Sequence, residues 1–204
     1  MNAATLTDSD PIVVTGNGME ILDESVTPNL ADNTQFKAVA GSGGVEHLFT
    51  IYNFGTNALN LTGTPRVAIT GTDAADFTVT TAPSNNVPVA GTTTLGITFH
   101  PLTLGDKSAT VTIANSAHPA NAFNFDIMGT GFAPATLKIA PDIGGSLRIS
   151  WPLAAAGYTL QQSAAIPGGW GAFGGTVHTD GPLGAENYVL ITPGGTMFYR
   201  LSLL

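Results

Sequence analysis

The stretch FTIYNFGTNALNLTGTP, residues 49–65, decides the fold class. Apolar and polar side chains alternate in it, with Phe49 and Ile51 before the break Asn-Phe-Gly-Thr-Asn and Leu59 and Leu61 after it. A period of two residues is typical of a strand with one buried side and one side in solvent. We interpret the break as the bend between two strands, where Gly55 permits backbone angles that other residues resist. The stretch therefore predicts a sheet with a structural turn, and no binding loop.

The same alternation recurs as far as residue 127. The apolar sets are Val67 and Ile69, Phe77 and Val79, Leu95, Ile97 and Phe99, Val111 and Ile113, and Phe123, Phe125 and Ile127. Threonine and asparagine occupy the positions between them, and glycine, proline and asparagine separate the runs. No window of a dozen residues has the 3.6-residue period of a helix. Repeated short strands predict an all-β fold of antiparallel sheets packed as a sandwich.

We expect two domains after a short arm. The arm covers residues 1–11, the first domain residues 12–132 and the second domain residues 133–204. The net charge changes at the same boundary, from −8 before it to 0 after it. The run Gly129-Thr130-Gly131 is interpreted as the turn that ends the first domain, and residues 23–44 as a long loop or crossover. Strands of the second domain are expected at 137–140, 146–151, 158–162, 188–192 and 198–203, around a glycine-rich stretch at 168–175.

The composition restricts the partners. Charged residues make up 10% of the 204-residue chain, and the six basic residues are scattered. Such a chain cannot neutralise a row of phosphates, so nucleic acid and membrane insertion are not expected. The absence of cysteine removes disulfides, thiol catalysis and cysteine-ligated metal sites. The low charge and the abundance of threonine and glycine favour a secreted, extracellular or cell-surface protein whose leader has been removed.

Several segments of the first domain carry a family resemblance. In order they are IVVTGNGMEI, DESVTPNLADNTQF, FTIYNFGTNALNLTGTPRVAITG, DFTVT, ITFHPLTLGDKSATVTIAN and FNFDIMGTGFA. Residues 12–132 thereby resemble the choice-of-anchor D domain of bacterial surface proteins, a relative of the ASH/HYDIN-type sandwiches. The resemblance implies an immunoglobulin-like fold in a secreted protein and carries no general enzymatic motif. Residues 135–204, with SLRISWP, GYTLQQS, Trp170 and FYRLS, resemble a small β module at the ends of secreted bacterial proteins.

We expect no enzymatic activity. The histidines at 47, 100, 118 and 178 form none of the patterns HxH, HxxxH or HExxH that pair zinc ligands. The sequence contains no GxSxG nucleophile elbow. The glycine runs at 16–18 and 129–131 are followed by no helix that would present amides to a phosphate. No catalytic residue, metal ligand or cofactor-binding residue is therefore assigned.

No cofactor is expected, and calcium is the one ion that the acidic loops could take. These loops hold Asp8 and Asp10, Glu20, Asp23 and Glu24, and Asp73 and Asp76. Calcium needs six to eight hard oxygens, and no DxDxDG loop is present. Aspartate also favours turns because its side chain accepts hydrogen bonds from nearby backbone. A turn role is the preferred interpretation, with calcium as the alternative.

Two hypotheses describe the function. The first is a structural module or adhesin part of a bacterial surface structure, with like subunits or other surface proteins as partners and a filament or surface layer as the possible assembly. Its N-terminal segment, with Ile12, Val13 and Val14 as subunit contacts, would add as a strand to a neighbour's sheet. The second is polysaccharide binding through an aromatic side chain. The candidates are Tyr52, Trp151, Tyr158, Trp170 and Tyr199; Trp151 is expected in the core, and Trp170 is the preferred contact.

Overall fold

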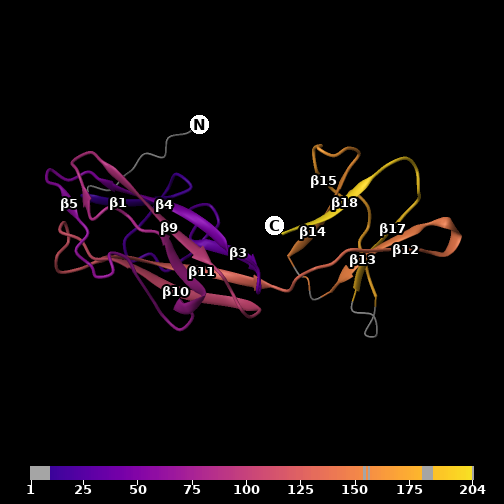
Figure 1. Cartoon of the computed structure of the whole chain (residues 1–204), viewed down its shortest axis with the longest axis horizontal. Helices are drawn as coiled ribbons and strands as arrows, with labels where there is room; N and C mark the ends of the chain where they lie inside the picture. The colour runs from indigo at the N-terminus through magenta and orange to yellow at the C-terminus, as the bar shows by residue number, and fades with distance from the viewer. Residues whose placement is uncertain (1–9, 154, 156, 181–185, 204) are drawn as a thin grey trace. The chain divides into compact units, whose positions relative to one another are not determined.

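The chain forms two compact units, Met1–Gly131 and Phe132–Leu204. The computed structural model describes residues 10–153, 155, 157–180 and 186–203 (Figure 1). Among these residues the only helices are two three-residue turns, η1 (Ala74–Asp76) and η2 (Ile143–Gly145). None of the described helices is long and apolar enough to cross a membrane. The fold is all-β, as the period-two alternation predicts.

The first unit is an immunoglobulin-like sandwich. One sheet has the order β2 (Met19–Ile21), β1 (Ile12–Gly16), β4 (Val45–Asn53), β9 (Thr92–Phe99) and β7 (Phe77–Thr81). The other has the order β3 (Gln35–Val39), β11 (Phe123–Phe132), β10 (Gly105–Ile113) and β6 (Ala68–Thr70). A two-stranded sheet of β5 (Leu59–Asn60) and β8 (Asn86–Val87) accompanies them. Figure 1 shows β1, β4 and β9 side by side in one layer, with β10 and β11 in the other.

The core of this unit lies between the two main sheets and consists of the residues that alternate in sequence. Every second residue of β11 from Phe123 to Gly131 is buried, and the residues between them are partly exposed. The largest fully buried side chains are Phe36, Phe49, Phe99, Phe125, Ile12, Ile51, Leu59, Leu95, Ile97, Ile113 and Ile127. Phe77 and Phe99 are in ring contact, with centroids 4.8 Å apart. Of the predicted apolar sets, only Ile69 and Val79 stay partly exposed, and both pack against this core.

Two expectations for this unit are wrong. Residues 23–44 are not all loop, because β3 lies within them and places Phe36 and Ala38 in the core. Gly129-Thr130-Gly131 is not a terminal turn, because it continues β11 opposite Gly105–Lys107 of β10. A Cβ on Gly129 would come within 2.5 Å of the Phe99 ring. Glycine is needed here for close packing, and the strand runs through it.

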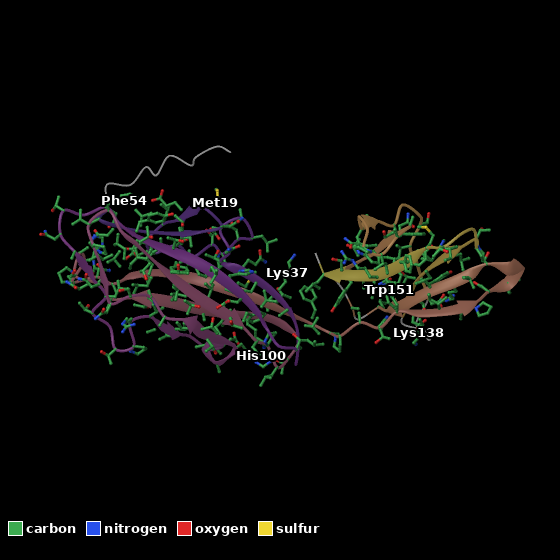
Figure 2. All side chains as sticks on the ribbon, turned by 45° about the horizontal axis from the view of Figure 1, so that its top comes forward. Met19, Lys37, Phe54, His100, Lys138 and Trp151 are labelled. Atoms are coloured by element: carbon green, nitrogen blue, oxygen red, sulfur yellow. The ribbon has the colours of Figure 1, made fainter. Side chains whose placement is uncertain are left out.

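The second unit packs two small antiparallel sheets against each other. One has the order β12 (Lys138–Pro141), β13 (Leu147–Pro152), β17 (Glu186–Ile191) and β16 (His178–Thr179). The other has the order β15 (Gly171–Ala172), β14 (Tyr158–Ser163) and β18 (Phe198–Leu203). The buried cluster between them is Ile149, Trp151, Ala155, Leu160 and Val189. Trp151 is 3% exposed, which confirms its predicted place in the core (Figure 2).

Candidate interaction sites

The three residues predicted as subunit contacts lie in β1, inside the first sheet. Ile12, Val13 and Val14 are at most 2% exposed. Strand β1 pairs along its length with β4, from Ile12 opposite Asn53 to Gly16 opposite Phe49, and its second half also pairs with β2. Residues 1–9 of the predicted arm lie outside the described residues. The subunit contact stays a prediction, and within one chain β1 is an interior strand.

The bend Asn-Phe-Gly-Thr-Asn is organised by the side chain of Asn53, which is 1% exposed. Its Nδ2 donates to the backbone oxygens of Asn57 and Val87, both at 2.9 Å, and its Oδ1 accepts from the Gly55 nitrogen at 2.9 Å. A hollow of about 270 Å³ lies beside the bend. The amide hydrogens of Asn53 are engaged internally, so the bend has the structural role that the sequence predicts.

The reason predicted for Gly55 is wrong. Its φ is not among the positive values of the chain, so no left-handed backbone requires glycine there. A Cβ at this position would lie 3.0 Å from the Cβ of Pro11 and 3.1 Å from Oδ1 of Asn53. The close approach of these two neighbours is what favours glycine.

The carboxylates of the acidic loops accept hydrogen bonds from backbone amides. Asp23 accepts from the nitrogens of Glu24 and Asn124, at 3.0 and 2.8 Å. Asp73 accepts from Ser108 at 3.0 Å, and Asp76 accepts from Leu102 at 3.3 Å. Apart from the bond from Glu24, these bonds connect segments far apart in sequence, and not the nearby backbone that the predicted turn role involves. Calcium binding stays a prediction. Asp8 lies outside the described residues.

His47 and His118 each contact different neighbours in the first unit. Nδ1 of His47 is 2.8 Å from the Asn33 oxygen, and its ring stacks on Phe36 at 4.1 Å. Nε2 of His118 is 3.3 Å from Oδ1 of Asp10. The described residues contain no group of three or more His, Cys, Asp or Glu side chains arranged to hold a metal ion.

A cleft of about 520 Å³ opens in the first unit beside the loop 63–67 and the end of β7 with the residues that follow it, 79–83. Val67, Val79 and two prolines contribute to its wall. Its one charged lining residue is Arg66, whose Nη1 donates to the Pro83 oxygen at 2.9 Å. The cleft is therefore a largely apolar hollow whose guanidinium already has a partner.

The aromatic candidates separate into core and surface residues. Tyr158 and Tyr199 pack against the core of the second unit, as Trp151 does. Tyr52 stacks on Phe54, with centroids 5.6 Å apart, and Phe54 is 51% exposed at the side of the first unit (Figure 2). Trp170 is half-buried and belongs to neither hydrophobic core. The structure thus places the preferred glycan contact at the surface.

Trp170 forms a small cluster with Arg200 and Gln161. The guanidinium carbon of Arg200 lies 4.4 Å from the centroid of the Trp170 ring. Nε of Arg200 donates to Oε1 of Gln161 at 2.8 Å, and these two residues are directly opposite each other on β18 and β14. Trp170 immediately precedes β15, whose Ala172 pairs with Gln161 on the other side. Strands β14 and β18 and the residue before β15 therefore contribute to one cluster, which we call the Trp170 cluster.

Arg200 and Gln161 are not among the residues predicted from the sequence. The alternation in FYRLS does place Arg200 on the opposite side from the core-packing Tyr199 and Leu201. Nothing local indicates that its neighbours are Gln161 and Trp170, because Gln161 and Arg200 are 39 positions apart in sequence and sheet pairing brings them together.

The other sheet of the second unit carries a second polar cluster. The guanidinium carbon of Arg148 lies 3.7 Å from the centroid of the Tyr188 ring, and Arg148 forms an ion pair with Asp180. Nζ of Lys138 is 2.7 Å from Oε1 of Glu186. Hydrogen bonds from Lys138 and Ser150 hold the pKa of the Glu186 carboxyl below its ordinary value. Each charge in this cluster has an opposite charge beside it.

Strand β18 is the longest strand at a sheet edge. It covers six residues, contains no proline, and pairs only with β14 among the described residues. The other edge strands are shorter, and β7 has a register irregularity between Val79 and Thr81. Such irregularities and short lengths protect edges against further pairing. The edge of β18 lacks both forms of protection.

The pairing of β14 shows which backbone groups of β18 face outward. The Phe173 nitrogen donates to the Leu160 oxygen, so Leu160 directs its backbone groups toward the β15 side. These groups alternate in direction along a strand, so Gln161 directs its own toward Arg200 of β18. Tyr199 and Leu201 therefore direct their backbone N–H and C=O groups away from β14, along the open edge.

These sheets define the class of protein as a β-sandwich module with an immunoglobulin-like first unit. No family model matches the chain, and no curated protein matches it. Solved structures that resemble it include an ASH/PapD-like domain of human CEP192, at 15% identity and a TM-score of 0.40 over 66% of this chain and 98% of that chain.

Two further structures extend over more of the chain. The secreted serine protease VesC from Vibrio cholerae is 11% identical, with a TM-score of 0.38 over 83% of this chain and 42% of that chain. A chaperone–tip adhesin complex of CFA/I fimbriae is 8% identical, with a TM-score of 0.33 over 83% of this chain and 95% of that chain. At these identities the likeness concerns the fold alone.

Proposed function

We propose that this chain is a non-enzymatic structural module of an extracellular bacterial surface protein, of the choice-of-anchor D type, and that like subunits join it by β-strand addition. The open edge of β18 is the observation that carries the proposal. Strand addition uses unpaired backbone groups at an edge, and pockets for alternate side chains add specificity. A six-residue edge without proline or a bulge suits this role.

The donor that we propose is the N-terminal segment of a like subunit. The sequence expectation that Ile12, Val13 and Val14 make the contact is consistent with their strand-forming, β-branched side chains. In the chain itself β1 pairs with β4 and β2. Its use as a donor therefore requires that it leave its own sheet, as in domain swapping, which exchanges an identical element between copies.

Substitutions at Leu201 test the acceptor edge. Proline at this position removes an N–H that faces away from β14, whereas alanine removes the same side chain and keeps the N–H. We expect wild type and Leu201→Ala to form oligomers or fibres, and Leu201→Pro to stay monomeric. Native mass spectrometry and electron microscopy measure this, and circular dichroism checks folding. Wild-type protein that stays monomeric at high concentration, without fibres, contradicts the proposal.

A second candidate function is glycan binding, and the surface position of Trp170 favours it. The ring lies outside both hydrophobic cores and is accompanied by Arg200 and Gln161. Rigid aromatic rings beside polar groups are common in binding surfaces because they supply contact area at low entropic cost. A glycan array probed with wild type and Trp170→Ala tests it. Absence of binding by both proteins on the array refutes this candidate.

A further inference from the structure

We infer that the Trp170 cluster binds the carboxylate of an acidic sugar, with Arg200 as the residue that recognises the charge. The inference deepens the second candidate function, glycan binding, and rests on it. It depends on three observations, which are the preorganisation of Arg200, the absence of a carboxylate partner for it, and the surplus of hydrogen-bond donors around it.

The guanidinium of Arg200 is held in place on two sides. Its guanidinium carbon lies over the Trp170 ring, 4.4 Å from the ring centroid, and Nε donates to Gln161. A guanidinium has five N–H donors in a rigid fork. One donor is engaged by Gln161, and in the described part of the chain neither Nη atom has a hydrogen-bond partner. The fork that matches a carboxylate is therefore oriented and open.

The acidic side chains described in the second unit all have partners other than Arg200. All ionisable side chains of residues 132–204 lie among the described residues, and they are three acids and three bases besides His178 and the tyrosines. Lys138 pairs with Glu186 and Arg148 with Asp180. The third acid, Asp142, accepts from the Ile143 nitrogen at 2.7 Å. Among the described residues of this unit, Arg200 is the basic residue with no carboxylate partner.

The groups around Arg200 are mostly donors. The Nε2 group of Gln161 and the indole N–H of Trp170 have no hydrogen-bond acceptor among the described residues. Thr159 and Ser202 form the next cross-strand pair on the same side of the sheet, two residues along from Gln161 and Arg200. A ligand rich in acceptors, with a carboxylate and neighbouring hydroxyl groups, satisfies such a surface. An acidic sugar residue has this composition.

Arg148 provides an internal comparison. It also lies over an aromatic ring, at 3.7 Å from the Tyr188 centroid, yet its charge is satisfied by Asp180. Arg148 and Arg200 thus both lie over an aromatic ring. Arg148 has a carboxylate partner, whereas Arg200 has none among the described residues. A bound sugar carboxylate would give Arg200 the partner that Asp180 gives Arg148.

Titration calorimetry with oligogalacturonate tests the inference on the full chain. The ligand controls are methyl-esterified oligogalacturonate, which keeps the sugar rings and loses the charges, and a glutamate peptide of equal charge. We expect the wild type to bind oligogalacturonate weakly at low salt and more weakly at about 0.15 M salt. Arg200→Gln should weaken binding about tenfold or more, since a charge-assisted bidentate contact is lost. Arg148→Gln, with the same charge change, should stay within about twofold of wild type.

Each other outcome overturns the inference in a distinguishable way. Equal binding of the methyl ester shows a neutral glycan site, which leaves glycan binding in place and removes the role of the carboxylate. Equal loss in Arg148→Gln and Arg200→Gln shows a non-specific charge effect. If only the glutamate peptide binds, an acidic sugar is not the ligand. If neither oligogalacturonate nor the glutamate peptide binds, the cluster is not a carboxylate-binding site. Arg200→Lys, which keeps the charge without the fork, should also bind more weakly than wild type.

Discussion

Nδ2 of Asn53 donates a hydrogen bond of 2.9 Å to the backbone oxygen of Val87, and this bond joins the end of β4 to β8. The same side chain also bonds to Gly55 and Asn57 within the bend. One buried amide therefore closes the turn and attaches it to a strand 34 residues away.

Replacement of Asn53 by alanine should lower the free energy of unfolding by about 2–4 kcal/mol, because two backbone oxygens lose their partner in a buried site. Chemical denaturation of the first unit measures the change. Asn57 is the matched control, since its side chain is exposed and only its backbone oxygen accepts the hydrogen bond from Asn53. Asn57→Ala should change the value by no more than about 0.5 kcal/mol. Equal effects of the two substitutions would contradict the role of the Asn53 amide.

Gly129→Ala should destabilise the first unit by about 1–3 kcal/mol, because the new Cβ would lie 2.5 Å from the Phe99 ring. Gly43→Ala is the control, since no atom lies within 4 Å of the added Cβ and its φ is not positive. Thermal unfolding compares the two. Phe99→Leu combined with Gly129→Ala should cost less than the sum of the single changes, because both act on one contact. Additive costs would show that the contact is not the cause.

The two tryptophans of the second unit should respond differently to truncation. Trp151→Ala removes the largest side chain of its buried cluster and should destabilise the unit by about 3–5 kcal/mol. Trp170→Ala should cost about 1 kcal/mol or less, because this half-buried ring lies outside the core. Hydrogen exchange of the amides in β13 and β17 reports on the unit directly. A larger loss for Trp170→Ala would mean that its ring supports the core after all.

The stability of the second unit should depend on Glu186 in a defined pH range. Its folded-state pKa lies below the ordinary value of 4.5, because Lys138 and Ser150 donate hydrogen bonds to its carboxylate. The contribution is fully present above pH 4.5 and is lost as the pH falls through the lowered pKa. Glu186→Gln should therefore be less stable than wild type at pH 7, and the difference should disappear in acid.

A double-mutant cycle with Lys138→Gln isolates the ion pair in this pH dependence. The coupling energy between the two substitutions should be small, since the pair is exposed to solvent and salt. This coupling energy should disappear in acid over the same pH range as the stability difference between wild type and Glu186→Gln. A difference between wild type and Glu186→Gln that persists unchanged in acid would show that a change in packing, and not the charge, is responsible.

The sequence predicts the buried face of most strands because the signal is local. Phe123, Phe125 and Ile127 alternate with polar residues, and a strand buries every second side chain wherever it lies in a sheet. The sequence does not predict β3, because its two buried residues, Phe36 and Ala38, lie in a polar and acidic stretch. The pattern predicts a turn at Gly129 because glycine commonly marks a turn, whereas the ring that requires glycine there, Phe99, is 30 residues earlier in the chain.

The sequence by itself determined the all-β class, the alternating core residues and the place of Trp151 within the core. Only the tertiary structure decided that β1 lies inside a sheet, that β18 lies at an edge, and that Arg200 meets Trp170 and Gln161. The physical reason is that alternation depends on the geometry of a single strand, whereas strand order and register depend on pairing between distant segments. The candidate sites of this protein depend on strand order and register, and therefore on the tertiary structure.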